Sequence, residues 1–156
     1  ISYEYDPTDA LKMPQLMAKA NDEVYIKDKN EDFMTLLSGI MGQKKRIHIH
    51  VGDVLDTELD EISAESHNSK QQVQALAQLI DDSILANYKL WPTNYIAYDL
   101  LHKTDKYSNL YSEKEKSVFE RRLEIRIDEK NPVEFEGFLA MYANPVINKS
   151  KYENVV

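Results

Sequence analysis

Two runs of alternating apolar and polar residues are the clearest strand signals in this sequence, and helical patterns separate them. In residues 1–7, Ile1, Tyr3 and Tyr5 occupy alternate positions, and Pro7 ends the run because proline cannot donate to a sheet. In residues 45–52, the aliphatic side chains again fall on every second position: Ile47, Ile49 and Val51. A two-stranded sheet is marginal, and three or more strands are usually needed. We therefore expect other polypeptide to complete the sheet.

The opening of the chain leads to the same expectation. The sequence begins with Ile1 directly inside a strand pattern, without an initiator methionine or a signal peptide. We therefore expect this chain to be a piece cut from a longer protein.

Most of the remaining apolar residues follow the spacing of an amphipathic helix. A helix is expected over residues 8–20 with an interruption near Pro14, and another over residues 33–41 that ends at Gly42. Residues 54–68 are expected to be turn-rich. Ser112 and Glu115 fit a capping box. The later helices are expected at residues 69–90, 94–101 with Thr93 as cap, 112–127, and 135–143 with Asn144 and Pro145 as the stop.

Composition excludes several classes of function. The formal net charge is −8, whereas a nucleic-acid partner needs a basic face that displaces counterions. The chain has no cysteine, so disulfides, thiolate catalysis and zinc–thiolate sites are excluded. No stretch approaches the roughly 20 apolar residues that span a bilayer. We expect no cofactor and no metal site.

Several segments resemble one enzyme family. Residues 1–7 (ISYEYDP) and 46–55 are similar to late strands of the glycerophospholipid acyltransferases, the lysophosphatidic acid and glycerol-3-phosphate acyltransferase superfamily. Residues 71–88 resemble the helix that closes their domain. Residues 90–101 (LWPTNYIAYDLL) and 141–145 (MYANP) resemble a subgroup of bacterial acyltransferases with an extra helical C-terminus.

The resemblance implies a fold and a division of the chain. The fold class is α/β, helix-dominated, as part of an acyltransferase-type three-layer domain with two strands present. Residues 1–90 would be the C-terminal part of that domain, 91–147 a helical extension and 148–156 a polar tail. Ile47, Ile49 and Val51 would lie in the sheet. The closing helix would use a buried stripe: Val73, Leu76, Ile80 and Ile84.

The resemblance also implies an activity, which is acyl transfer from acyl-CoA or acyl carrier protein to a glycerol-phosphate-type hydroxyl. The family uses a His-x-x-x-x-Asp block, in which the histidine is the general base. That block would lie upstream of Ile1, in the N-terminal catalytic half of the parent protein. We therefore expect this chain alone to be inactive, and to be cytoplasmic or held at the inner face of the membrane by its parent.

One motif matches the catalytic block by letters alone. His48 and Asp53 have the His-x-x-x-x-Asp spacing, but five residues of strand span about 16 Å and point such side chains to opposite faces. His48 and His50 share a strand face, yet a metal site would need at least a third ligand. We interpret this segment as a polar strand face.

An aromatic cluster in residues 91–99 is the candidate binding region. Its members combine large rings with two polar groups: Trp91, Asn94, Tyr95, Tyr98 and Asp99. As a site, they would form the wall of an acyl-chain groove or a docking surface. The alternative interpretation is a helix packed on the main domain by its aromatic side.

Two further hypotheses remain open. The chain could be a non-enzymatic helical module that binds a protein partner through residues 91–101. It could also self-associate as an isolated fragment, because exposed sheet edges pair between copies.

Overall fold

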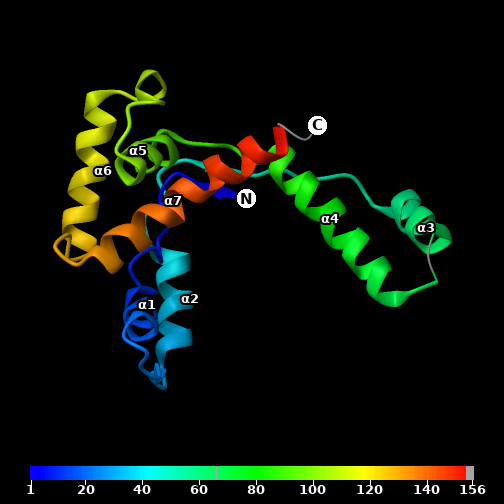
Figure 1. Cartoon of the computed structure of the whole chain (residues 1–156), viewed down its shortest axis with the longest axis horizontal. Coiled ribbons are helices and arrows are strands. Elements are labelled where there is room, and N and C mark those ends of the chain that lie inside the picture. The colour runs from blue at the N-terminus through cyan, green and yellow to red at the C-terminus, as the bar shows by residue number, and fades with distance from the viewer. Residues whose placement is uncertain (66, 154–156) are drawn as a thin grey trace.

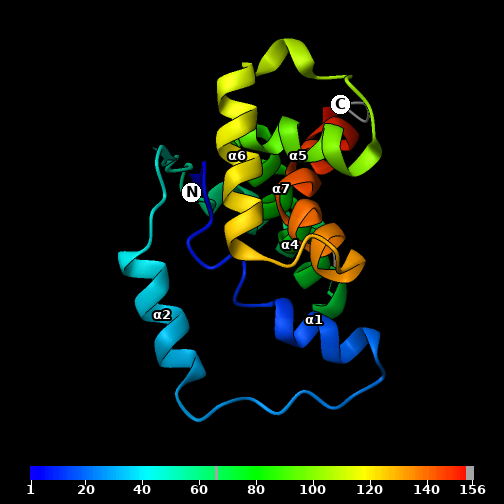
Figure 2. The same ribbon diagram turned by 90° about the vertical axis from the view of Figure 1, so that its left-hand side faces the viewer.

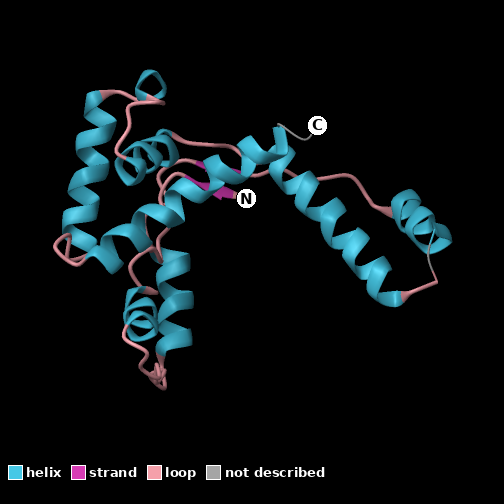
Figure 3. Ribbon diagram, in the orientation of Figure 1, coloured by secondary structure: helices cyan, strands magenta, loops and turns pink. Residues whose placement is uncertain are grey.

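The computed structural model describes residues 1–65 and 67–153, and this part of the chain is dominated by helices (Figure 3). Its only sheet has two antiparallel strands, so the expected mixture of α and β structure is confirmed at this level. The elements in chain order are β1 (Ser2–Tyr3), α1 (Met13–Ala20), α2 (Glu31–Met41), β2 (Ile47–His48), α3 (Asp56–Glu65), α4 (Ser69–Asn87), α5 (Pro92–His102), the 3-10 helix η1 (Ser108–Leu110), α6 (Glu113–Arg126) and α7 (Pro132–Glu153).

The hydrophobic core lies where α5, α6 and α7 pack together, and α1 packs against α7 at one end (Figure 2). Ring packing joins α6 to α7, with the Phe119 and Tyr142 centroids 5.2 Å apart in an edge-on arrangement. Residues on both sides of position 90 share this core. The fully buried apolar side chains are Ile96, Ala97, Phe119, Phe138, Leu139 and Ala143, and Tyr5 and Met13 join the same cluster.

A buried carboxylate, Asp9, fixes the N-terminal segment to the core. Asp9 is 0% exposed, and its Oδ2 accepts hydrogen bonds from Arg122 Nε of α6 at 2.7 Å and from the Tyr142 hydroxyl of α7 at 2.8 Å. The Tyr142 hydroxyl in turn accepts from the backbone N–H of Asp6 at 3.0 Å. Since an uncompensated buried charge is costly, this pairing is what allows Asp9 to sit in the interior.

A second buried carboxylate, Glu4, connects β1 to the basic residues before β2. Its two oxygens accept hydrogen bonds from Lys45 Nζ and Arg46 Nε, each at 2.6 Å. Burial alone would raise the pKa of Glu4, but the hydrogen bonds and charges of Arg46 and Lys45 outweigh it and hold that pKa below its usual value. The Thr93 hydroxyl of α5 donates to the Glu4 carbonyl at 2.8 Å, so β1 is also attached to the core.

The second strand is shorter than the sequence pattern predicts. Residues 45–52 were expected to form one strand, but only Ile47 and His48 pair, with Tyr3 and Ser2 respectively. Lys45 has a left-handed φ of 58°, which breaks the strand before it is established. Of the three residues expected in the sheet, only Ile47 lies in β2. The three aliphatic side chains are exposed by 49%, 64% and 86%: Ile47, Ile49 and Val51.

The expected closing helix forms but does not close the sheet. α4 covers the predicted range and is capped by Asn68, whose side chain accepts from the Lys70 N–H at 3.0 Å. Its apolar stripe, however, is largely uncovered, with Leu76 half-buried and the others exposed: Val73, Ile80 and Ile84. Figure 1 shows α4 and α3 extending away from the α5–α7 core.

The last helix runs past its expected stop. Asn144 and Pro145 were expected to end it, and residues 148–156 to be a polar tail, but α7 continues to Glu153. Pro145 lacks only one N–H, and the buried Val146, 2% exposed, holds the next turn against the core. Residues 154–156 of the expected tail lie outside the described residues.

Other expectations at helix ends have mixed outcomes. Gly42 follows α2, and Ser112 with Glu115 forms the predicted capping box at α6. Pro14 lies in the first turn of α1, where its missing N–H costs nothing, so α1 begins there instead of being interrupted. The acidic segment expected to be turn-rich contains α3.

Among residues 1–65 and 67–153, no helix combines the length and the apolar character required to cross a bilayer.

We predict that Asp9→Ala lowers the free energy of unfolding by about 3–5 kcal/mol, because it leaves the buried Arg122 guanidinium without its carboxylate. The matched control is Asp32→Ala, which breaks the exposed ion pair with Lys27 and should cost no more than about 1 kcal/mol. Urea unfolding followed by circular dichroism measures both. Equal losses in the two variants would contradict a structural role for the Asp9 network.

Candidate functional site

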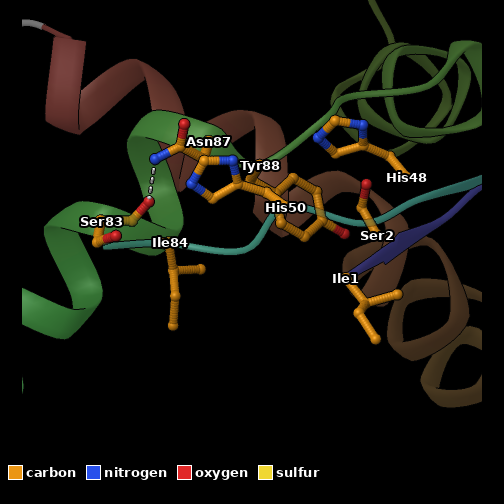
Figure 4. Close-up of a pocket in the computed structure, with 9 residues that line it drawn as sticks. Ile1, Ser2, His48, His50, Ser83, Ile84, Asn87 and Tyr88 are labelled. Carbon is orange, nitrogen blue, oxygen red and sulfur yellow. Dashed lines mark hydrogen bonds between the residues drawn. The ribbon is translucent and has the colours of Figure 1, made fainter. Parts of the chain in front are cut away.

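A pocket of about 330 Å³ lies between the two-stranded sheet and the C-terminal end of α4 (Figure 4). The chain after β2 passes close to α4 here: a Cβ added to Gly52 would lie 3.7 Å from Ser83 Oγ. Ile1, Gly52 and Ile84 add apolar surface. The polar side chains that line the pocket are Ser2, His48, His50, Ser83, Asn87 and Tyr88.

Ser2 is the unusual member of this pocket. It is 2% exposed, and its hydroxyl has no hydrogen-bond partner among the described residues. In Figure 4 that hydroxyl points toward the side of the pocket where His48 lies. Tyr88 stands opposite, and burial, together with the negative charge of Asp6, raises the pKa of its phenol.

The pocket does not contain the partners needed for acid–base catalysis. A catalytic histidine is normally oriented by a carboxylate, and no Asp or Glu lines this pocket. Asp53 is exposed and lies outside the pocket, so the His48–Asp53 spacing does not assemble a catalytic pair. Within the described residues, no group of three or more His, Cys, Asp or Glu side chains could hold a metal ion. The arrangement can hold a polar group by hydrogen bonds.

Trp91 and Asn94, expected in a groove, lie inside the fold. Asn94 is 2% exposed; its Oδ1 accepts from the Trp91 N–H at 2.7 Å, and its Nδ2 donates to the Tyr142 carbonyl at 2.9 Å. Trp91 precedes α5 and is 8% exposed, with the Arg46 guanidinium 5.0 Å from its ring centroid. These two residues therefore attach the start of α5 to α7 and to the β2 segment.

Asp99 organises the turn after α5. It is 4% exposed, and its Oδ2 accepts from the Tyr107 N–H and from the Tyr111 hydroxyl, both at 3.0 Å. Tyr95 and Tyr98 are half-buried and contact the Tyr107 ring with centroid distances of 5.2 and 5.1 Å. The structure brings all the predicted aromatic residues onto α5 and its N-cap, but it uses the polar ones as internal hydrogen-bond partners.

Besides the α4 stripe, the fold leaves two further apolar surfaces exposed. The α2 stripe comprises six large side chains exposed by between 36% and 77%: Phe33, Met34, Leu36, Leu37, Ile40 and Met41. The β2 edge comprises Ile47 of β2 and the exposed Ile49 and Val51, which follow β2 along the chain. Exposed apolar patches of this kind mark surfaces that bind protein, membrane or an apolar ligand. The sequence pattern identifies both surfaces as apolar, but it does not say which partner buries them.

The comparisons with protein-family models, with curated proteins and with solved structures find no match to this chain.

We predict that Tyr111 ionises late. Burial and the hydrogen bond to Asp99 raise its pKa from 10.0 to about 12. Because the pKa is raised in the folded state, the neutral Tyr111 phenol stabilises the folded chain. That contribution is complete below pH 10, the ordinary tyrosine value, and is lost as the pH rises toward 12. Ultraviolet difference titration of the wild type against Tyr111→Phe isolates this one phenol. A difference signal centred near the ordinary tyrosine value would refute the Asp99 contact.

Proposed function

We propose that this chain is the C-terminal portion of a glycerophospholipid-type acyltransferase. The parent protein would transfer an acyl group from a thioester donor, acyl-CoA or acyl carrier protein, to a glycerol-phosphate-type hydroxyl. The catalytic His-x-x-x-x-Asp block would lie in the N-terminal half of the parent protein. Support comes from the resemblance of residues 1–7, 90–101 and 141–145 to that family, and from the surfaces that this chain leaves open.

The observation that carries the proposal is the exposure of the α2 stripe and the β2 edge. Phe33 is 64% exposed, Ile40 68% and Val51 86%, although both segments have the apolar periodicity of buried structure. Burying one such side chain stabilises by about 1.5–3 kcal/mol, so covering the α2 stripe alone is worth on the order of 10 kcal/mol. A driving force of this size favours a permanent partner, and the catalytic half of the same chain is such a partner.

In this proposal the chain has a structural role in the parent enzyme. β1 and β2 would extend the sheet of the catalytic domain, and α2 would bury its stripe against that domain. The α5–α7 core, which also includes Tyr5 and Met13, would remain as the helical extension. A parent that acts on glycerophospholipids works at the inner face of the membrane, which this chain would reach through the parent protein.

The interaction-module alternative receives less support from the geometry. It requires residues 91–101 to present a free face, yet Trp91, Asn94 and Asp99 are buried and engaged with the rest of the fold. Within residues 91–101 the half-buried residues are Pro92, Tyr95, Tyr98, Leu100 and Leu101, and none is fully exposed. We therefore place partner binding on the α2 stripe and the β2 edge instead.

We predict that the chain alone shows no acyl transfer with acyl-CoA and glycerol 3-phosphate or 1-acylglycerol 3-phosphate, whereas the full parent protein does. His48→Gln in the parent should leave turnover near the wild-type rate, because no carboxylate orients that imidazole. The matched change is His→Gln in the upstream His-x-x-x-x-Asp block, which should abolish turnover. Release of free coenzyme A measures the rate. Turnover by the chain alone, or a parent protein without such a block, would refute the proposal.

A further inference from the structure

We propose that the β2 edge binds a second copy of this chain, as an antiparallel strand pair centred on Ile49. The inference depends on the direction of the backbone groups and on the charges of residues 44–53, and it does not require the acyltransferase assignment. The two copies would be related by a two-fold axis, so that the same edge serves both partners.

The backbone groups of β2 point alternately toward β1 and away from it. Glu4 N–H donates to the Arg46 carbonyl at 2.9 Å, and Ser2 lies opposite His48, so the even-numbered residues of this strand direct their backbone groups toward β1. In an antiparallel ladder the odd-numbered residues then direct theirs to the other side. Within the part of the chain that the structure describes, the backbone N–H groups of residues 49–54 donate no hydrogen bond to another backbone group. The outer edge of β2 is therefore open at Ile47, and in the proposed dimer residues 49–51, which follow β2 without forming a strand in the single chain, would extend the pairing.

In this register, aliphatic side chains of one copy lie opposite aliphatic side chains of the other. With Ile49 opposite Ile49 of the second copy, Ile47 lies opposite Val51, and all these aliphatic side chains project from one face of the paired strands. Ile47, Ile49 and Val51 are 49%, 64% and 86% exposed in the single chain. Pairing therefore places the most exposed apolar residues of the edge against one another, which stabilises the strand pair.

Charge is distributed unevenly along the β2 edge. Three basic residues precede the strand and Asp53 follows it; the bases are Lys44, Lys45 and Arg46. Glu4 pairs with Lys45 and Arg46, and Glu115 Oε1 lies 3.7 Å from Arg46 Nη2, so two carboxylates face three basic residues and one positive charge remains. Antiparallel pairing brings the basic end of one copy to the acidic end of the other, whereas parallel pairing would oppose like charges at both ends. The charges thus select the antiparallel arrangement.

The paired segment is short, so we expect a reversible dimer. In the parent protein, a strand of the same polypeptide would compete for this edge with a high effective concentration and would exclude the second copy. Dimer formation is therefore a property of the separate chain. If the separate chain does not dimerise, the acyl-transfer proposal still stands. If the parent protein shows no acyl transfer, the dimer proposal still stands.

Sedimentation equilibrium of the 156-residue chain over a wide concentration range tests the proposal. We expect a monomer–dimer equilibrium, and Ile49→Lys should raise the dimer Kd by about tenfold or more, because two lysines would face each other across the axis. Val73→Lys, an equally exposed change on α4, should leave Kd unchanged. A monomer at all concentrations would overturn the proposal. Dimer loss in Leu36→Lys with retention in Ile49→Lys would also overturn it, by assigning the contact to the α2 stripe.

The register itself can be tested with a single thiol. The chain has no cysteine, so Ile49→Cys introduces the only one, and the two-fold axis places the two thiols opposite each other. A short bis-maleimide reagent should cross-link this variant into a dimer, and Val73→Cys should stay monomeric under the same conditions. Equal cross-linking of the two variants would contradict pairing at Ile49.

Discussion

The ion pair of Asp9 with Arg122, joined by the Tyr142 hydroxyl, is the contact on which the fold depends most. It lies in the interior and links the N-terminal segment to α6 and α7. Arg122 and Tyr142 are 113 and 133 residues from Asp9 along the chain. A buried ion pair adds little free energy of folding over apolar side chains of equal volume. Removing one partner, however, leaves an uncompensated buried charge and is strongly destabilising. Its contribution is therefore to fix one arrangement of these segments. Glu4 adds the β2 segment to that arrangement through Lys45 and Arg46.

This constraint divides the molecule into a covered and an uncovered part. α5, α6 and α7 with the first residues of the chain bury a continuous core, and α2, β2 and α4 are attached to it but keep apolar side chains in solvent (Figure 1). Gly42 shows how tightly α2 is joined at its C-terminal end, because a Cβ there would lie 2.5 Å from the Pro7 Cβ. The C-terminal end of α2 therefore contacts the segment around Pro7, while the apolar residues of the α2 stripe are exposed.

The sequence allowed the helices to be predicted well and their surroundings poorly. The spacing of Phe138, Leu139 and Tyr142 and the Ser112–Glu115 capping box are local signals, and both were confirmed. Ile49 was predicted in a strand and lies outside β2, and Val73 was predicted buried and is exposed, because periodicity says which residues share a face and not whether another element covers it. No local pattern pairs Asp9 with Arg122 across the chain. The pocket residue Ser2 had no signal either, since its lack of a hydrogen-bond partner is a property of the folded chain.

The central claim is that the α2 stripe and the β2 edge are surfaces that the rest of the parent protein covers. Hydrogen–deuterium exchange measures this most directly, by comparing the dilute single chain with the same residues inside the full parent protein. The account predicts that amides of residues 33–41 and 47–51 exchange much more slowly in the parent, while amides of α5 and α7 change little. Equal exchange of residues 33–41 and 47–51 in the two proteins would contradict it.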